Sequence, residues 1–182
     1  WLDRYADWLA PESYLLDLGC GTGRTTEYLV RAGHAVVAAD ISDVALRKLS
    51  RRLPDVTTRE LDMSRGLPWP DAHFDAVVAD LCLHYFDEAT TRYVVGEILR
   101  MLRPCGAFLG RVNSAEDTAH GAGAGTAVEP GYYRLDGHYK RFFDRQSAES
   151  FFGVFCGLRI VAGTTRTGRG TKRLYEIAGR RP

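Results

Sequence analysis

The stretch that decides the fold is YLLDLGCGTG, residues 14–23. Its first five residues form an apolar run typical of a buried strand, and three closely spaced glycines follow at once. Residues 24–32 then have the pattern of a helix that ends at Gly33. A glycine-rich turn between a strand and a helix lets a ligand approach the backbone, and the helix N-terminus offers free N–H groups. We therefore predict a nucleotide-type binding site at this turn.

The spacing of the glycines separates this loop from a dinucleotide-binding fingerprint. That fingerprint is GxGxxG, which would require glycine at position 24, where this chain has Arg24. The loop instead reads GxGxG, which suits a nucleoside with an amino-acid tail better than a pyrophosphate. A nicotinamide-dependent oxidoreductase would share the predicted sheet, but Arg24 argues against it.

Short apolar runs alternate with stretches of helical length up to about residue 109, as in strand–helix units of a parallel sheet. The predicted strands after the first lie at residues 34–39, 56–61, 74–80, 107–112, 158–164 and 173–178. The predicted helices after the first lie at residues 42–53, 87–103 and 145–155. The last two strands are joined by a Gly-rich turn at 166–171, so they must be antiparallel. Residues 114–131 are rich in Ala and Gly, and we expect them to form a long functional or disordered loop.

Composition limits the class of protein. The chain has 182 residues, 45% apolar and 26% charged, as expected for one soluble globular domain. Its formal charge of +1 creates no overall attraction to nucleic acid or acidic membranes. The four cysteines lie far apart, so we expect neither a metal site nor a disulfide framework. The longest apolar stretch, residues 151–158, is too short to cross a bilayer, and a cytoplasmic location is predicted. The first residue is Trp1 rather than Met, which leaves open whether residues precede it.

Two acidic residues lie at the carboxyl ends of predicted strands, as the glycine loop does. Asp40 ends the second strand, at the position where acidic side chains contact ribose hydroxyls in doubly wound sheets. Asp62 follows the third strand. Because carboxyl ends of parallel strands meet at one edge of a sheet, we expect the loop and both acids to share a ligand.

These residues resemble the class I S-adenosylmethionine-dependent methyltransferases. The resemblance is carried by residues 15–23, Asp40, Asp62, the segment LPWPDAHFDAVV at 67–78 and the segment LRMLRPCGA at 99–107, together with the closing hairpin. It implies an α/β, Rossmann-like, doubly wound sheet of seven mostly parallel strands with an antiparallel last strand and helices on both faces. It implies one domain, residues 1–182. Within it we expect a cofactor-binding core at about 14–112, a lid and acceptor-binding segment at 113–144, and a C-terminal helix and hairpin at 145–182.

The resemblance also implies roles for single residues. The glycine loop would lie against S-adenosylmethionine, with Asp40 at the ribose hydroxyls and Asp62 at the adenine amino group. Asp17 would meet the methionyl amine directly or through water. Ile41 and Met63 would flank the ribose and adenine, or equally they could be core residues. The implied cofactor-binding residues are Asp17, Gly19, Cys20, Gly21, Thr22, Gly23, Asp40, Ile41, Asp62, Met63 and Asp80.

The acceptor of the methyl group is less readable. Methyl transfer is an in-line displacement, so correct positioning supplies most of the catalysis, and a base is needed only where the acceptor carries a proton. Residues 80–86, after the fourth strand, would pass beside the sulfonium of the cofactor. Among them His84 is the candidate base, because an unperturbed imidazole titrates near neutrality. The alternative is that His84 and Tyr85 pack or cap the next helix.

An aromatic and basic segment follows the long loop. Residues 131–144 contain Tyr139, a second candidate catalytic residue, and Arg141. We hypothesise that they form the acceptor-binding wall together with His84 and Tyr85, with residues 114–131 as a lid. Equally, Phe142 and Phe143 could belong to the core, and Arg141 could be a surface charge. The predicted function is methyl transfer from S-adenosylmethionine to a small-molecule acceptor, giving S-adenosylhomocysteine.

Other acceptors and a non-catalytic role remain open. A basic group near the C-terminus meets a single acid, Glu176, and could favour an RNA or DNA acceptor. That group consists of Arg159, Arg166, Arg169, Lys172, Arg173, Arg180 and Arg181. However, Arg outnumbers Lys along the whole chain, and no separate nucleic-acid-binding module is visible. A protein acceptor, or binding of the cofactor without catalysis, is also compatible with the sequence.

Overall fold

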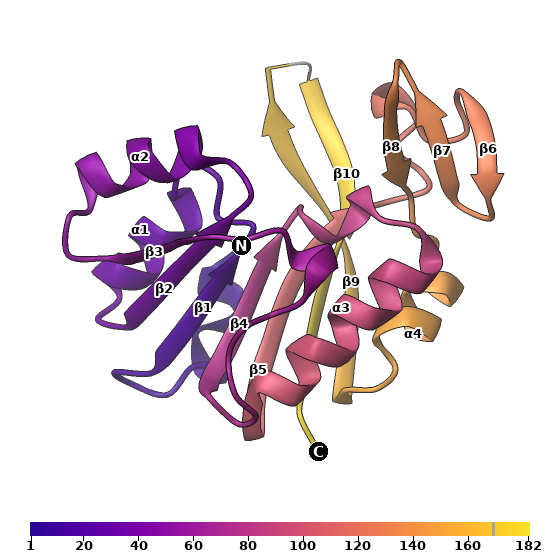
Figure 1. Cartoon of the computed structure of the whole chain (residues 1–182). Helices are drawn as coiled ribbons and strands as arrows, with labels where there is room; N and C mark the ends of the chain where they lie inside the picture. Colours follow the sequence, from indigo (N-terminus) through magenta and orange to yellow (C-terminus); the bar gives the residue numbers. More distant parts are fainter. Residues whose placement is uncertain (169) are drawn as a thin grey trace.

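The computed structural model describes residues 1–168 and 170–182, so Arg169 of the basic group lies outside the described residues. The centre of the molecule is a seven-stranded sheet in the order β3-β2-β1-β4-β5-β10-β9 (Figure 1). Its strands are β1 (Tyr14–Leu18), β2 (Ala35–Asp40), β3 (Thr57–Glu60), β4 (Phe74–Asp80), β5 (Leu102–Asn113), β9 (Cys156–Thr167) and β10 (Gly170–Arg180). The first five strands are parallel, and β10 is antiparallel to both β5 and β9. This confirms the predicted fold class.

Helices cover both faces of the sheet, because side chains alternate along each strand. Leu15 packs in the cluster shared with η1 (Leu2–Trp8) and α1 (Arg24–Arg31). Its neighbour Leu16 packs in the cluster shared with α3 (Glu88–Met101) and α4 (Arg145–Phe152). On the first of these faces, α2 (Asp43–Arg52) packs against Ala38 of β2. The order of the strands reverses between β1 and β4, and in sheets of this kind the crevice at that point binds ligands.

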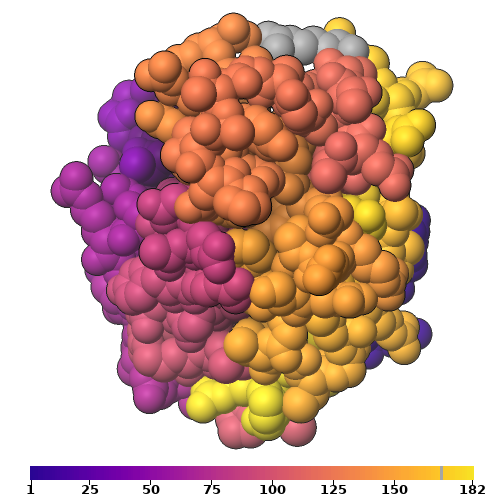
Figure 2. Space-filling model, turned by 90° about the vertical axis from the view of Figure 1, so that its right-hand side faces the viewer, coloured from indigo at the N-terminus to yellow at the C-terminus, as the bar shows by residue number. Residues whose placement is uncertain are grey.

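A second, three-stranded sheet corrects the expectation of a long loop at 114–131. The chain there forms η4 (Thr118–His120) and β6 (Thr126–Glu129), and continues into β7 (Tyr132–Leu135) and β8 (His138–Arg141). We call residues 118–141 the cap. Three of the four residues of β6 are exposed, so the strand lacks the apolar alternation that sequence analysis requires. Figure 2 shows the cap closely packed on the body of the molecule above α3 and α4.

The closing hairpin is also longer than predicted. The turn expected at 166–171 is mostly strand, since β9 reaches Thr167 and β10 begins at Gly170. Backbone hydrogen bonds do not depend on side chains, so glycine-rich residues can extend a ladder that their composition does not indicate. As a result the hairpin stands above the carboxyl ends of the parallel strands, beside β8 (Figure 1). No helix among the described residues is both long enough and apolar enough to span a membrane.

Candidate functional site

The glycine loop is held against the end of β2. The backbone N–H groups of Gly19 and Cys20 both donate to the carbonyl of Ala39, at 2.8 and 3.0 Å. Gly19 has φ of +71°, and a Cβ atom at this position would collide with the side chain of Cys82. Gly21 also has a positive φ, but a Cβ there would meet open space. The backbone of the loop is therefore fixed from behind and open on its ligand side.

Asp40 connects the loop to the start of α2. One carboxylate oxygen accepts a hydrogen bond from the Gly21 N–H at 2.7 Å, and the other accepts from the Ser42 N–H at 2.9 Å. Each oxygen retains a lone pair, because a carboxylate can accept about four hydrogen bonds. The side chain is partly exposed and lines a pocket, so it can also accept bonds from a vicinal diol.

Asp62 lies at the N-terminus of the short helix η2 (Met63–Arg65). Its Oδ1 accepts from the backbone N–H and the hydroxyl of Ser64, at 3.0 and 2.6 Å, and Oδ2 lies 3.2 Å from the guanidinium of Arg65. The bonds from Ser64 hold the pKa of this carboxyl below its usual value. Asp62 is thus an ionised acceptor fixed in position at the rim of the same pocket.

The pocket has a volume of about 430 Å³, within the range of small-molecule sites. It is lined by Gly19, Asp40, Ile41, Leu61, Asp62, Met63, Leu81, Cys82, Tyr85 and Phe86. Six of these residues were implied by sequence: Gly19, Asp40, Ile41, Asp62, Met63 and Tyr85. The rest of the glycine loop adjoins the pocket through Gly19, while Asp17, Asp80, His84, Tyr139 and Arg141 do not line it.

Four further lining residues had no predicted individual role, and three of them, Leu81, Cys82 and Phe86, come after β4 in the segment that contains His84. Leu81 has φ of +55°, a strained conformation for a residue with a side chain, and strain of this kind concentrates at functional sites. The Cys82 thiol donates to the Leu18 carbonyl at 3.1 Å and fixes this turn against β1. Their signal in the sequence was their place immediately after the fourth strand. Phe86 belongs to the same segment, whereas the contribution of Leu61 depends on packing and has no such signal.

Asp17 is fully buried beneath the loop. Its Oδ2 accepts a bond from the Thr26 hydroxyl at 2.5 Å, while Oδ1 has no partner among the described residues. Burial, opposed by the Thr26 bond, raises the pKa of Asp17 to about 7. A buried carboxyl oxygen without a partner fits a bound cationic or hydrogen-bond-donating group, such as an amine.

Asp80, at the end of β4, forms an ion pair with a residue that the sequence did not indicate. The guanidinium of Arg111 on β5 forms a two-pronged ion pair with Asp80, at 2.7 and 2.8 Å. The Thr25 hydroxyl adds a longer bond of 3.4 Å. Asp80 is therefore charge-balanced within the protein, which leaves its side chain less acceptor capacity for a ligand than that of Asp40.

His84 lies in η3 (Leu83–Tyr85) and is only 3% exposed. Burial, with smaller effects from Lys172 and Lys140, lowers the pKa of the imidazole to about 3. An imidazole with so low a pKa is a weak base at neutral pH, so the structure does not support the prediction that His84 is a general base. Its Nδ1 is buried without a hydrogen-bond partner among the described residues.

Arg141 and Tyr139 occupy different environments. Arg141 is 2% exposed, pairs with Glu129, and donates to the carbonyls of Phe86 and Pro130, each at 3.2 Å. It is thus an internal link between the cap and η3, and not the open wall or surface charge considered above. Tyr139 is 44% exposed and stacks on Tyr132, with ring centroids 5.6 Å apart.

Three aromatic residues, Tyr132, Phe142 and Phe143, lie next to Arg141 and Tyr139 in sequence or in space. Phe142 and Phe143 are buried, in agreement with the core interpretation. The hydroxyl of Tyr132 donates to the carbonyl of Tyr85 at 3.0 Å, which ties β7 to the rim of the pocket. Tyr85 itself is 52% exposed, so it is available at the border between the pocket and the cap.

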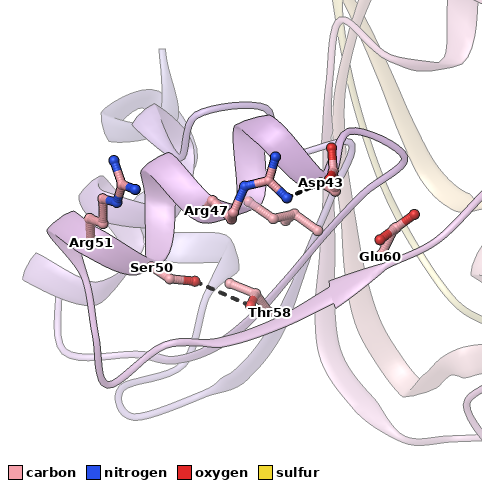
Figure 3. Close-up of a pocket in the computed structure, with 7 residues that line it drawn as sticks. Asp43, Arg47, Ser50, Arg51, Thr58 and Glu60 are labelled. Carbon is pink, nitrogen blue, oxygen red and sulfur yellow. Dashed lines mark hydrogen bonds and ion pairs between the residues drawn. The ribbon is translucent and has the colours of Figure 1, made fainter.

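A larger hollow of about 540 Å³ lies elsewhere, between α2 and the edge strand β3 (Figure 3). It is lined by charged and polar side chains, of which Asp43 and Arg47 pair with each other at 2.5 Å and Ser50 and Thr58 lie 3.4 Å apart. The hollow lies on the flank of the sheet, away from the point where the strand order reverses. Nor do the described residues gather three or more metal-ligating side chains anywhere.

Comparison with known proteins identifies the family. Residues 15–106 match the family model of a methyltransferase domain, and this range contains the whole pocket. An uncharacterized methyltransferase of Synechocystis is 32% identical over 100 residues, which are 55% of this chain and 47% of that protein. The chain thus spans about half the length of the curated relatives that it matches.

Solved structures share the fold. A methyltransferase dependent on S-adenosylmethionine from Methanosarcina mazei superposes with a TM-score of 0.85 at 17% identity, covering 98% of this chain and 96% of that one. The 1,6-didemethyltoxoflavin-N1-methyltransferase of Burkholderia thailandensis, solved with its acceptor and S-adenosylhomocysteine, has a TM-score of 0.73 at 23% identity, covering 99% and 74%. With the family model matching half of its length, the chain belongs to the class I S-adenosylmethionine-dependent methyltransferases.

Proposed function

We propose that this protein transfers a methyl group from S-adenosylmethionine to a small-molecule acceptor and releases S-adenosylhomocysteine. The observation that carries the proposal is the pocket at the reversal of strand order, where the glycine loop, Asp40 and Asp62 converge. When bound, S-adenosylmethionine supplies a methyl group on a sulfonium, which is a good leaving group. What the protein must add is binding and alignment.

The residues fit this cofactor part by part. The open backbone at Gly21 and the spare acceptor capacity of Asp40 suit a nucleoside with two ribose hydroxyls. Asp62 would accept from the adenine amino group, and Ile41 and Met63 would flank the rings. The unpartnered oxygen of Asp17 would accept from the methionyl amine, which is a cation. Cys20, Thr22 and Gly23 would contribute backbone, and Asp80 would act mainly by holding Arg111 beside the loop.

A small molecule is the acceptor class that we favour over nucleic acid. The related fold from Burkholderia thailandensis is that of an enzyme acting on a small molecule. In addition, the C-terminal arginines are largely used within the protein. Arg180 bonds to the carbonyls of Cys105 and Trp8, Arg181 bonds to that of Arg100, and Arg173 pairs with Glu116. Guanidinium groups held in this way have fewer N–H donors free to contact phosphate oxygens.

We further propose that the whole chain acts as one methyltransferase domain with the cap over the acceptor. The cap joins the rim of the pocket through Tyr132 and Arg141. A cap attached in this way can exclude water from the reacting atoms and orient the acceptor. In this proposal Tyr85 and Tyr139 present aromatic surface to the acceptor, while Arg141 positions the cap.

Release of S-adenosylhomocysteine is the direct test. The purified protein would be incubated with S-adenosylmethionine and a panel of small-molecule acceptors, and the product quantified by mass spectrometry. We expect turnover with at least one acceptor, reduced at least about tenfold in Asp40→Asn because one ribose hydrogen bond is lost. Asp43→Asn, a change of the same kind outside the pocket, serves as the matched control and should retain activity. Binding of the cofactor without turnover on any acceptor would contradict the proposal and favour a non-catalytic role.

A further inference from the structure

Positive side chains are distributed unevenly in this protein. The chain contains only three lysines, Lys48, Lys140 and Lys172, among 24 basic residues. Lys140 on β8 and Lys172 on β10 interact electrostatically with each other and with His84 of η3. We call His84, Lys140 and Lys172 the acceptor cluster. Its members come from three separate elements and lie far apart in sequence, so their meeting is a product of the fold.

The fold explains how these three elements meet. Leu174 of β10 pairs with Asn113, the last residue of β5, so Lys172 extends beyond the carboxyl end of β5. Lys140 pairs with Tyr133 in the cap, and β8 packs against η3. Both the hairpin and β8 rise above the sheet (Figure 1), and Lys172 and Lys140 are close enough to interact electrostatically. The acceptor cluster therefore sits above the carboxyl edge, next to Tyr85, which lines the cofactor pocket.

The charges of this cluster are not balanced within the protein. The ion pairs of the described residues are all formed by arginine, apart from the pair of His120 with Asp117. Asp117 is the one acid that attracts Lys172; its Oδ1 is hydrogen-bonded to His120 at 2.9 Å, and its Oδ2 is buried without a hydrogen-bond partner among the described residues. With His84 neutral, two ammonium groups and one carboxylate leave one net positive charge. Lys140 and Lys172 are both half-buried, and burial lowers the pKa of Lys172.

A second observation points to a ligand at the same place. The imidazole of His84 is buried, and its Nδ1 has no partner among the described residues. Buried polar atoms normally have a partner, and an unmet one calls for a ligand or water. Unbalanced positive charge beside an unmet polar atom is the combination that recognises a small anion with a hydrogen-bonding group.

We propose that the methyl acceptor is a small organic anion, held by Lys140 and Lys172 beside His84 at the border of the cofactor pocket. This inference rests on the proposed function, since it names the acceptor class of the same site. Two ammonium groups also stabilise the deprotonated form of an acceptor. An acceptor bound as the anion needs no general base, which agrees with a buried, neutral His84.

Binding of a carboxylate probe tests the inference without requiring the true acceptor. The protein saturated with S-adenosylhomocysteine would be titrated with benzoate and with the neutral benzamide, while the imidazole resonances of His84 are followed by NMR. We expect benzoate, and not benzamide, to shift the His84 signals. Lys140→Met and Lys172→Met should each weaken benzoate binding about tenfold, as expected when one charge-assisted contact is lost.

Lys48→Met is the matched control, because Lys48 is exposed on α2 and lies outside the acceptor cluster. It should bind benzoate as the unmodified protein does. Calorimetry with S-adenosylhomocysteine on every variant shows whether the cofactor site and the fold are intact. The anionic acceptor is overturned, and the proposed function stands, if S-adenosylhomocysteine binds but benzoate does not. The same conclusion follows if benzamide shifts the His84 signals as benzoate does, or if the lysine variants bind benzoate as tightly as the unmodified protein. If S-adenosylhomocysteine does not bind, both fail.

Discussion

The cofactor pocket and the acceptor cluster are assembled in different ways. The pocket draws on residues that come directly after β1, β2 and β4, so the parallel sheet brings them together by its topology alone. The acceptor cluster depends on η3, on the cap and on a hairpin that reaches beyond the sheet. The cofactor pocket is therefore fixed by local geometry at strand ends, while the acceptor cluster depends on how distant segments pack.

The largest effect should follow from filling the glycine loop. Gly19→Ala adds a Cβ at a positive φ, where it meets Cys82, so the loop must move away from its place against β2. We expect the affinity for S-adenosylmethionine to fall by at least about a hundredfold, together with a stability loss of about 1–2 kcal/mol from the backbone strain. Calorimetry and thermal melting measure the two effects.

Gly33→Ala provides the control for this change. Gly33 also has a positive φ, but a Cβ there meets open space and the residue lies outside the pocket. It should lose similar stability and keep its affinity for S-adenosylmethionine. Equal losses of affinity in the two variants would show that the loop geometry is not what holds the cofactor.

Removing the side chain of Arg141 should destabilise the cap and leave the cofactor pocket intact. Arg141→Ala leaves Glu129 without its cation and empties a buried position, so we expect a stability loss of about 3 kcal/mol. Hydrogen exchange should become faster in β6, β7 and β8, while the folded protein still binds S-adenosylmethionine. Tyr139→Phe, which removes only the hydroxyl of an exposed ring, should leave stability unchanged. A cap equally protected in both variants would refute the linking role of Arg141.

Asp17 should make cofactor affinity depend on pH. Because burial raises its pKa to about 7, the carboxyl is largely protonated in acid and cannot pair with the methionyl amine. We expect the affinity for S-adenosylmethionine to fall by up to about tenfold for each pH unit below 7. Asp17→Asn should bind weakly with little dependence on pH. A dependence that survives in this variant would assign the titration to another group.

The same group has a predictable effect on the stability of the ligand-free protein. The folded state binds the Asp17 proton up to about pH 7, whereas the unfolded state releases it near 3.8. The folded state therefore binds more protons in between, and the contribution of Asp17 to the free energy of unfolding falls as pH rises from about 4 to 7. Denaturant melts of the unmodified protein and Asp17→Asn should converge as the pH is lowered.

The smallest effect concerns α4, which supports the cap from below. Asp144 caps this helix through the backbone N–H of Ser147 at 2.7 Å, and Ser147 bonds back to the Asp144 N–H at 3.0 Å. Asp144→Ala should cost about 1 kcal/mol of stability, measured as a lower urea midpoint. Cofactor affinity should not change. A matching loss of affinity would mean that the two halves of the site are coupled through α4.

The residues of the cofactor pocket could largely be predicted from the sequence, whereas those of the acceptor cluster could not. Gly19 and Asp40 could be placed at one edge because they come at the ends of strands with a clear apolar pattern. Asp62 could be placed there only from its position after the next predicted strand, since β3 itself is polar and largely exposed. Leu81 and Cys82 share that position, but nothing in their chemistry marked them. Arg111 could not be foreseen as the partner of Asp80, because the pair depends on the register of β4 against β5.

The sequence predicts a lid in this region but not the strands of the cap, and the reason is physical. These strands are short and largely exposed, so they lack the alternation that predicts a strand. Arg141 illustrates the consequence, since its sequence neighbours indicate a basic surface while the fold buries it against Glu129 and the carbonyls of Phe86 and Pro130. Lys140 and Lys172 are 32 positions apart, and only the paired strands show that they share one cluster.

Calorimetric titration with S-adenosylmethionine, S-adenosylhomocysteine and NAD measures whether the carboxyl edge of the sheet binds the expected cofactor. We expect the first two to bind and NAD not to bind, and we expect Asp40→Asn to weaken both at least about tenfold while Asp43→Asn leaves them unchanged. Binding of NAD, or affinity for S-adenosylmethionine that is indifferent to Asp40, would contradict the assignment of this edge of the sheet as the cofactor site.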